Sequence, residues 1–189
     1  MSANEVSAND SRPPASGLVI RPARPEDHAA IGALLVSTYR ALPGMPSPDQ
    51  QPAYYGMLAD VAGRASRPAL TIFVATDEAG HLLGSIDVIE DMTQYGSGGS
   101  ASTLTDAAGV RLLAVDGAVH GRGVGKALTR LAIDRARALG KKRLVVHTTK
   151  VMQTAWAMYE GLGFVRFPEI DFRQGSLDVF GFRPDLTAP

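Results

Sequence analysis

Three glycines that alternate between a strand-like segment and a long helix constrain this chain more than any other feature. Residues 113–128 read LAVDGAVHGRGVGKAL and contain Gly121, Gly123 and Gly125. At such a turn, backbone N–H groups converge on the positive end of a helix and bind an anion, typically a phosphate. Glycine matters there because a Cβ would collide with the phosphate. A turn that merely joins strand to helix is the alternative, but three glycines between two well-defined elements favour phosphate binding.

Two well-known phosphate-binding fingerprints do not fit this segment. A dinucleotide fingerprint starting at Gly121 would need a glycine where Lys126 stands and an acid about 20 residues later, yet residues 141–146 contain none. A nucleotide P-loop would need glycine at His120 and serine or threonine at Ala127. The sequence therefore predicts a phosphate ligand of another kind.

Composition indicates one globular domain without metal or nucleic-acid chemistry. The 189 residues are 45% hydrophobic, which is enough for one core, and we expect that domain at residues 18–185. Residues 1–17 are rich in Ser, Asn, Asp and Pro, so we expect a disordered tail. Nineteen basic residues balance nineteen acidic ones, which disfavours nucleic acid and membrane surfaces as partners.

The absence of cysteine narrows the chemistry and the compartment. Without Cys the chain has no disulfide, no thiolate metal site and no cysteine nucleophile, and its four histidines show no metal-ligand spacing. No apolar run approaches the roughly 20 residues of a spanning helix, and no signal peptide is apparent. We expect a cytoplasmic protein that acts on a small molecule or a protein.

Hydrophobic periodicity predicts a mixed α/β domain. The clearest helix spans about residues 124–139, with one apolar face and a glycine at its end. Residues 70–76 and 82–90 read as a hairpin. Further strands are expected at 18–20, 110–115, 144–149, 164–167 and 177–182, and further helices at about 25–40, 53–63 and 155–162. Residues 92–109 are rich in Gly, Ser, Thr and Ala, so we expect a flexible loop that is dispensable for folding, either a functional lid or simply disordered.

The glycine turn and a second motif together resemble the Gcn5-related N-acetyltransferase (GNAT) superfamily. Residues 120–125 read HGRGVG, similar to the family's Q/R-x-x-G-x-G/A, and residues 155–164 read AWAMYEGLGF, similar to its A-x-x-x-Y-E-x-x-G-F. The resemblance implies a mixed, strongly twisted sheet of about six to seven strands flanked by about four helices, with splayed fourth and fifth strands. This sequence departs from the family pattern in three places: His120 stands where Gln or Arg is preferred, Gly117 where Pro is common, and Met152 where Asn is frequent.

The resemblance also implies a cofactor, acetyl-CoA, and residues that bind it. The pantetheine arm would bond the backbone near Leu113, Ala114 and Val115, as an added strand would. The phosphates would lie on the turn that comprises His120, Gly121, Arg122, Gly123, Val124, Gly125 and Lys126.

Catalytic candidates carry alternatives that the sequence leaves open. In the family, a tyrosine at the position of Tyr159 donates a proton to the departing thiolate; a core aromatic residue is the alternative. The glutamate that some relatives use as base is absent, because Gly109 stands there. Glu90 and Asp91 are the next candidates, since they end a strand and neighbouring acids can raise a pKa; a solvated strand end is their alternative. His147 would be a natural base if it points into the cleft, and a hydrogen-bonded core histidine is the alternative that the sequence favours.

The implied function is direct transfer of acetyl from acetyl-CoA to a primary amine of a small molecule or peptide. A non-catalytic acyl-CoA-binding or regulatory module is the alternative. Arg111 either pairs with an acidic acceptor group or is a sheet-edge cation with a solvated head. Tyr39, Tyr54 and Tyr55 are specificity candidates. Relatives acetylate many kinds of amine, so the acceptor stays open. Homodimers are common among proteins that resemble this one, so a dimer also stays open.

Overall fold

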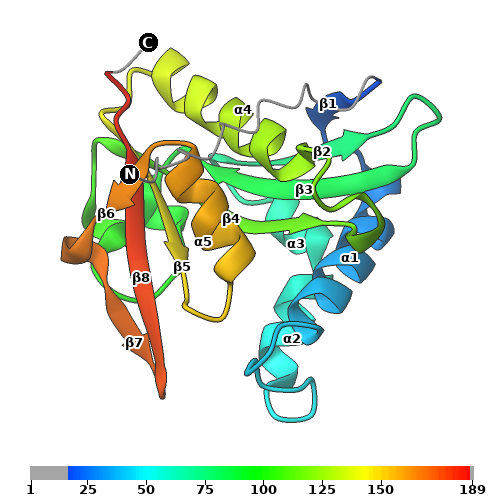
Figure 1. Ribbon diagram of the computed structural model, residues 1–189, viewed down its shortest axis with the longest axis horizontal. Coiled ribbons are helices and arrows are strands. Elements are labelled where there is room, and N and C mark those ends of the chain that lie inside the picture. Colours follow the sequence, from blue (N-terminus) through cyan, green and yellow to red (C-terminus); the bar gives the residue numbers. More distant parts are fainter. Residues whose placement is uncertain (1–16, 188–189) are drawn as a thin grey trace, which may run out of the picture.

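The computed structural model describes residues 17–187, and eight strands form its sheet (Figure 1). The expected tail therefore lies outside the described residues except for Gly17. The strands are β1 Val19–Pro22, β2 Leu70–Thr76, β3 Leu82–Ile89, β4 Ala107–Val115, β5 Arg143–Thr148, β6 Phe164–Arg166, β7 Phe172–Gln174 and β8 Leu177–Pro184. Their order is β1-β2-β3-β4-β5-β8-β6, with β7 paired to β8. Only β4 and β5 run parallel to each other, so the sheet is mixed as expected.

Five α-helices cover the two faces of this sheet. They are α1 His28–Arg40, α2 Pro52–Ala59, α3 Val61–Ala65, α4 Val124–Ala138 and α5 Gln153–Gly161. One core cluster joins α1, α2 and α3 to one face, and the other joins α4 and α5 to the opposite face (Figure 1). No helix within residues 17–187 has both the length and the apolar character needed to cross a membrane.

The most strongly patterned elements match the sequence-based expectation. Strands β2 and β3 pair antiparallel from Leu70 opposite Ile89 onward, as the expected hairpin does. Helix α4 buries one apolar face that includes Val124, Leu128 and Ala132. The expected helix at 53–63 is instead two helices, because the chain turns at Asp60, whose carboxylate accepts a hydrogen bond from Gly63 N–H.

Strands β4 and β5 diverge after a short stretch of pairing, and β4 carries a bulge where they part. The parallel pairs run only from Ala107 opposite Arg143 to Val110 opposite Val146. On the other edge, two steps of β3 from Ser85 to Asp87 face three steps of β4. The extra residue is accommodated at Leu112, which has a φ of 52°, a conformation that L-residues rarely adopt. The far half of β4 therefore has a free edge beside an opening in the sheet.

Residues 92–109, which the sequence predicts to be a flexible loop, contain buried side chains. Met92 and Tyr95 are 2% and 0% exposed, and Ala101 is also buried. Two short 3-10 turns lie at 92–94 and 101–103, and β4 already begins at Ala107. This burial argues against a dispensable loop, because two large side chains in a Gly- and Ser-rich segment reach the core.

We predict that Tyr95→Ala lowers the free energy of unfolding by about 3–5 kcal/mol, as for other large aromatic truncations in a core. The ring fills the space above Gly109, where an added Cβ would stand 2.5 Å from the Tyr95 ring. Tyr95→Phe keeps this packing and serves as the control. Denaturant unfolding of both variants checks the prediction, and a stability unchanged in Tyr95→Ala would restore the original view of a dispensable loop.

Candidate active site

The glycine turn forms a cradle of free backbone donors at the start of α4. Gly121 and Gly123 have φ values of 76° and 81°, which favour glycine. Among the residues that the structure describes, no acceptor receives a hydrogen bond from the N–H groups of Val124, Gly125 or Lys126. These donors and the dipole of α4 favour a bound anion.

This cradle opens into a cleft of about 1840 Å³. Its wall combines the end of β4, the glycine turn and α4 with α5 and the segment before α5. Arg122, Lys126, Arg130 and Lys150 line it and supply positive charge for phosphates. All ten residues expected to bind the cofactor line this one cleft: Leu113, Ala114, Val115, His120, Gly121, Arg122, Gly123, Val124, Gly125 and Lys126.

The free edge of β4 runs along the cleft toward the turn. Beyond Val110 the strand has no partner on its β5 side, so backbone N–H and C=O groups there can pair with an extended ligand. His120 folds back, and its Nε2 lies 3.1 Å from the carbonyl oxygen of Val115. The edge and the cradle thus suit the amides and the phosphates, respectively, of one elongated molecule such as acetyl-CoA.

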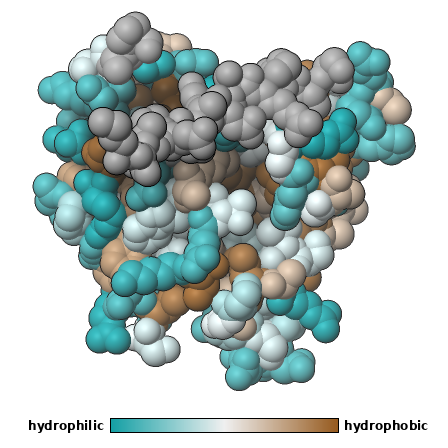
Figure 2. All heavy atoms as spheres, viewed as in Figure 1, coloured by the Kyte–Doolittle hydropathy of each residue, from teal (hydrophilic) through white to brown (hydrophobic). Residues whose placement is uncertain are grey.

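A second cavity, of about 880 Å³, meets the cleft where β4 and β5 separate. Tyr39, Leu113, Met152 and Ala155 line both spaces. On the face of the molecule shown in Figure 2, hydrophobic atoms lie toward the middle, between more hydrophilic margins. The junction gives two ligands a place to meet from opposite sides of the sheet.

Tyr159 lies in the wall of the second cavity. It comes from α5, is 3% exposed, and its ring packs 5.1 Å from that of Phe164. Burial raises the pKa of Tyr159 well above its usual value, so the phenol keeps its proton at neutral pH. A protonated hydroxyl at this position can donate to a leaving group.

His147 also lines the second cavity, from β5. Its Nε2 lies 2.8 Å from the carbonyl oxygen of Ile170, so the proton resides on Nε2 and donates to that oxygen. Its Nδ1 is then an acceptor, and the Ser97 hydroxyl lies 3.3 Å from it. Burial is the main reason that the pKa of His147 is lowered, which keeps the ring neutral. Its place in the cavity could not be read from the sequence, which does not say which way a strand residue points.

The structure does not bring Glu90 and Asp91 to Tyr159. Glu90 accepts a charge-assisted hydrogen bond from Arg135 of α4, and neither carboxylate lines either cavity. Asp91 accepts hydrogen bonds from the Thr93 N–H and hydroxyl, which lower the pKa of Asp91. This placement argues against Glu90 and Asp91 as the base and favours their structural alternative.

Of the three tyrosines that are specificity candidates, two line the second cavity and one does not. Tyr39 and Tyr54 line the second cavity, and burial raises the pKa of Tyr54 to about 12. Tyr55 donates to the carbonyl oxygen of Pro46 and is absent from the wall. The Tyr95 ring occupies the space beside Gly109, so a glutamate side chain at position 109 would not fit.

A split sheet with a turn of free N–H donors beside the split is the arrangement expected of an acyl-CoA-dependent transferase, and comparison with known proteins agrees. The family described as acetyltransferase (GNAT) family matches residues 33–164. The Escherichia coli (strain K12) protein named uncharacterized N-acetyltransferase YjgM is 30% identical over 131 residues, which cover 67% of this chain and 75% of that protein. The chain belongs to the GNAT family of acetyltransferases.

Solved structures share the fold. A GNAT acetyltransferase from Staphylococcus aureus MU50 superposes with a TM-score of 0.68 at 14% identity, covering 89% of this chain and 99% of that one. Spermidine N-acetyltransferase from Vibrio cholerae, solved with CoA and spermine, gives 0.60 at 19% identity, covering 92% of this chain and 99% of that one.

Proposed function

We propose that this protein transfers acetyl from acetyl-CoA to the primary amine of a small molecule or peptide. The observation that carries the proposal is the junction of two cavities at the split between β4 and β5, with Tyr159 beside it. The cleft fits the cofactor because its turn leaves backbone donors free and its wall is basic. Acetyl-CoA supplies an activated acetyl thioester.

The protein's own groups position the reactants and move two protons. The free edge of β4 and the glycine turn hold the cofactor, so that its thioester end reaches the junction. The second cavity holds the amine, whose nitrogen forms a bond to the acetyl carbon as the carbon–sulfur bond breaks. Tyr159 donates its proton to the departing thiolate. Proximity within one complex supplies much of the rate, and no cysteine is needed.

His147 is the group we assign to take the proton that the amine gives up. It is neutral, its Nδ1 is unprotonated and faces the Ser97 hydroxyl, and it lies in the wall of the acceptor cavity. No carboxylate within residues 17–187 lines that cavity and could do this instead. Asp171, which is paired with Arg166, raises the pKa of His147, and Arg111 lowers it.

Release of CoA thiol from acetyl-CoA in the presence of a panel of amines tests the proposal. We expect release that depends on both the protein and an amine, with N-acetylated product in equal amount. Tight binding of acetyl-CoA without release for any amine in the panel would instead support the non-catalytic binding module.

We predict that His147→Gln slows acetyl transfer at pH 7 by about 100-fold, the lower end of what general acid–base catalysis contributes. The amide can still donate to the Ile170 carbonyl, so the fold is retained, but it cannot take a proton. The rate of the variant should rise with pH as the free amine becomes more abundant, while that of the wild type levels off above the lowered pKa of His147. Parallel pH–rate profiles would contradict the assignment.

A further inference from the structure

The charge in the acceptor cavity is of one sign. Arg111 and Arg173 are the charged side chains of its wall, and His147 is a further basic side chain there. No Asp or Glu of the described residues lines the cavity. An acceptor with several ammonium groups, such as a polyamine, would lose hydration there without gaining a carboxylate partner. The cavity is therefore built for a different kind of amine.

Arg111 is a cation without a carboxylate partner in residues 17–187. Its side chain is half-buried, and its Nη1 donates to the carbonyl oxygen of Tyr95 at 2.9 Å. The guanidinium also lies 6.0 Å from the centre of the Tyr95 ring. Two contacts hold the group in place, and its remaining N–H donors have no acceptor among the described residues.

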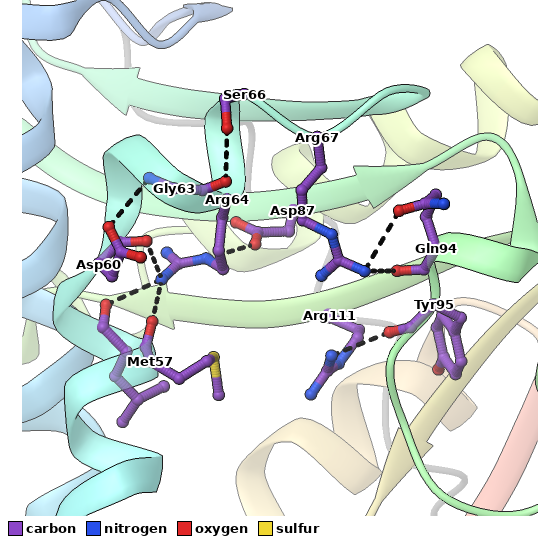
Figure 3. A network of polar contacts seen from close by, with 11 residues as sticks. Met57, Asp60, Gly63, Arg64, Ser66, Arg67, Asp87, Gln94, Tyr95 and Arg111 are labelled. Carbon is purple, nitrogen blue, oxygen red and sulfur yellow. Dashed lines mark hydrogen bonds and ion pairs between the residues drawn. The ribbon is translucent and has the colours of Figure 1, made fainter.

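The carboxylate opposite Arg111 in the sheet forms its ion pair with another arginine. Asp87 lies opposite Arg111 in the register of β3 and β4, but its Oδ2 accepts from Arg64 Nε at 2.9 Å, deep in the core. Arg67 approaches the same region and donates to the carbonyl oxygen of Gln94 at 2.7 Å. Figure 3 shows the three arginines around one carboxylate, with the guanidinium of Arg111 turned away from Asp87. Three arginines and one carboxylate leave two positive charges without an ion-pair partner among the described residues, on Arg67 and Arg111, and of these two Arg111 lines the acceptor cavity.

The remainder of the cavity wall combines aromatic and apolar side chains with polar ones such as Thr148 and Thr149. The rings of Tyr54 and Tyr39 meet edge to face with their centroids 6.1 Å apart, Met57 also lines the cavity, and Phe172 lines it where its ring meets that of His147. Because of the bulge at Leu112, the consecutive residues Arg111 and Leu112 both lie on the face of the sheet that helices α1, α2 and α3 cover. An anion at Arg111 and an apolar group among the aromatic rings can thus be bound by one small molecule.

We propose that the acceptor is a small amine that also carries a carboxylate, such as an α-amino acid with an apolar side chain, and that Arg111 binds the carboxylate. The inference rests on the proposed acetyltransferase function. A guanidinium suits a carboxylate because it presents paired donors in one plane. Held by Arg111, the acceptor directs its α-amine toward the junction with the cofactor cleft.

Matched acceptors test the carboxylate requirement. Phenylalanine and methionine, their primary amides, phenethylamine and spermidine would be compared by kcat/KM in acetyl transfer. We expect the two amino acids to exceed their amides and phenethylamine by about 30-fold or more, and spermidine to be the poorest. Equal rates for acids and amides, or a preference for spermidine, would overturn the inference and leave the acetyltransferase function intact.

Variants separate recognition by Arg111 from a structural role. Arg111→Met should lower kcat/KM for the amino acids far more than for phenethylamine and leave acetyl-CoA affinity unchanged, and Arg111→Lys should restore part of the preference for the amino acids. Arg173→Gln is the matched control, because Arg173 lines the same cavity but is 71% exposed and paired with Asp178. Equal losses for all acceptors in Arg111→Met would show a structural role.

A binding measurement gives an answer without turnover. In the presence of CoA, N-acetylphenylalanine should bind the wild-type protein. Neutral N-acetylphenethylamine should bind the wild-type protein at least about 30-fold more weakly, and N-acetylphenylalanine should bind the Arg111→Met variant with a similar loss of affinity. Equal affinities for the two ligands would overturn the proposal even if no acceptor were acetylated. Absence of acetylation with preferential carboxylate binding would contradict the proposed function alone.

Discussion

Replacing Gly125 with glutamate is expected to abolish acetyl-CoA binding while the protein stays folded. Gly125 is the second residue of α4 and borders the cleft, where an added Cβ would stand 3.1 Å from Met158 Sδ. The new carboxylate would enter the space meant for a phosphate. Two like charges about 4 Å apart at an effective dielectric constant of about 20 repel by about 4 kcal/mol, which is roughly a 1,000-fold loss of affinity.

Gly117→Glu is the matched control for this variant. Gly117 lies in the same connection from β4 to α4, has open space around its Cβ position and does not line the cleft. It introduces the same charge without blocking the cradle, so its affinity for acetyl-CoA should stay within a few-fold of wild type. Calorimetric titration of both variants, with thermal unfolding to check folding, decides the matter. Unchanged affinity in Gly125→Glu would make the assignment of the turn wrong.

Tyr159→Phe is expected to slow acetyl transfer by about 10² to 10⁴-fold and to leave acetyl-CoA affinity nearly unchanged. The substitution keeps the ring that packs on Phe164 and removes only the hydroxyl. Since that hydroxyl acts on the thiolate that develops as the thioester breaks, its contribution belongs to the transition state. The loss should fall at the lower end of this range if water enters and donates instead.

Single-turnover transfer at saturating acetyl-CoA isolates this effect from product release. An amine of high pKa makes the chemical step slow and the defect clearest. Tyr55→Phe is the control, because Tyr55 is a buried tyrosine that bonds Pro46 and lines neither cavity. Equal single-turnover rates for the Tyr159→Phe variant and the wild type would return Tyr159 to a packing role.

Local patterns were sufficient to predict the elements that dominate the fold. The apolar face of α4 and the β-branched run of β2 identify a helix and a strand whatever surrounds them, and both occur as expected. The glycine turn was recognisable because Gly121 and Gly123 need positive φ in this chain. The ten residues expected to hold the cofactor consequently line one cleft.

Features that depend on contacts distant in sequence could not be predicted in the same way. Tyr95 is buried because Gly109, fourteen positions later, leaves room for its ring, and the composition around both residues indicates only a loop. The strained conformation of Leu112 follows from the register of two strands, which no local pattern records. The hydrogen bond from Arg135 of α4 to Glu90 joins residues 45 positions apart, so the sequence alone did not indicate that this carboxylate is paired.

The most direct test of the account is a single-turnover experiment in which acetyl-CoA is mixed with excess protein and an amine, and the products are identified by mass spectrometry. The account predicts that one N-acetylated amine forms for each CoA released, at a rate that depends on the amine concentration. Acetyl-CoA that stays intact, or that yields acetate at the same rate with and without the amine, would contradict it.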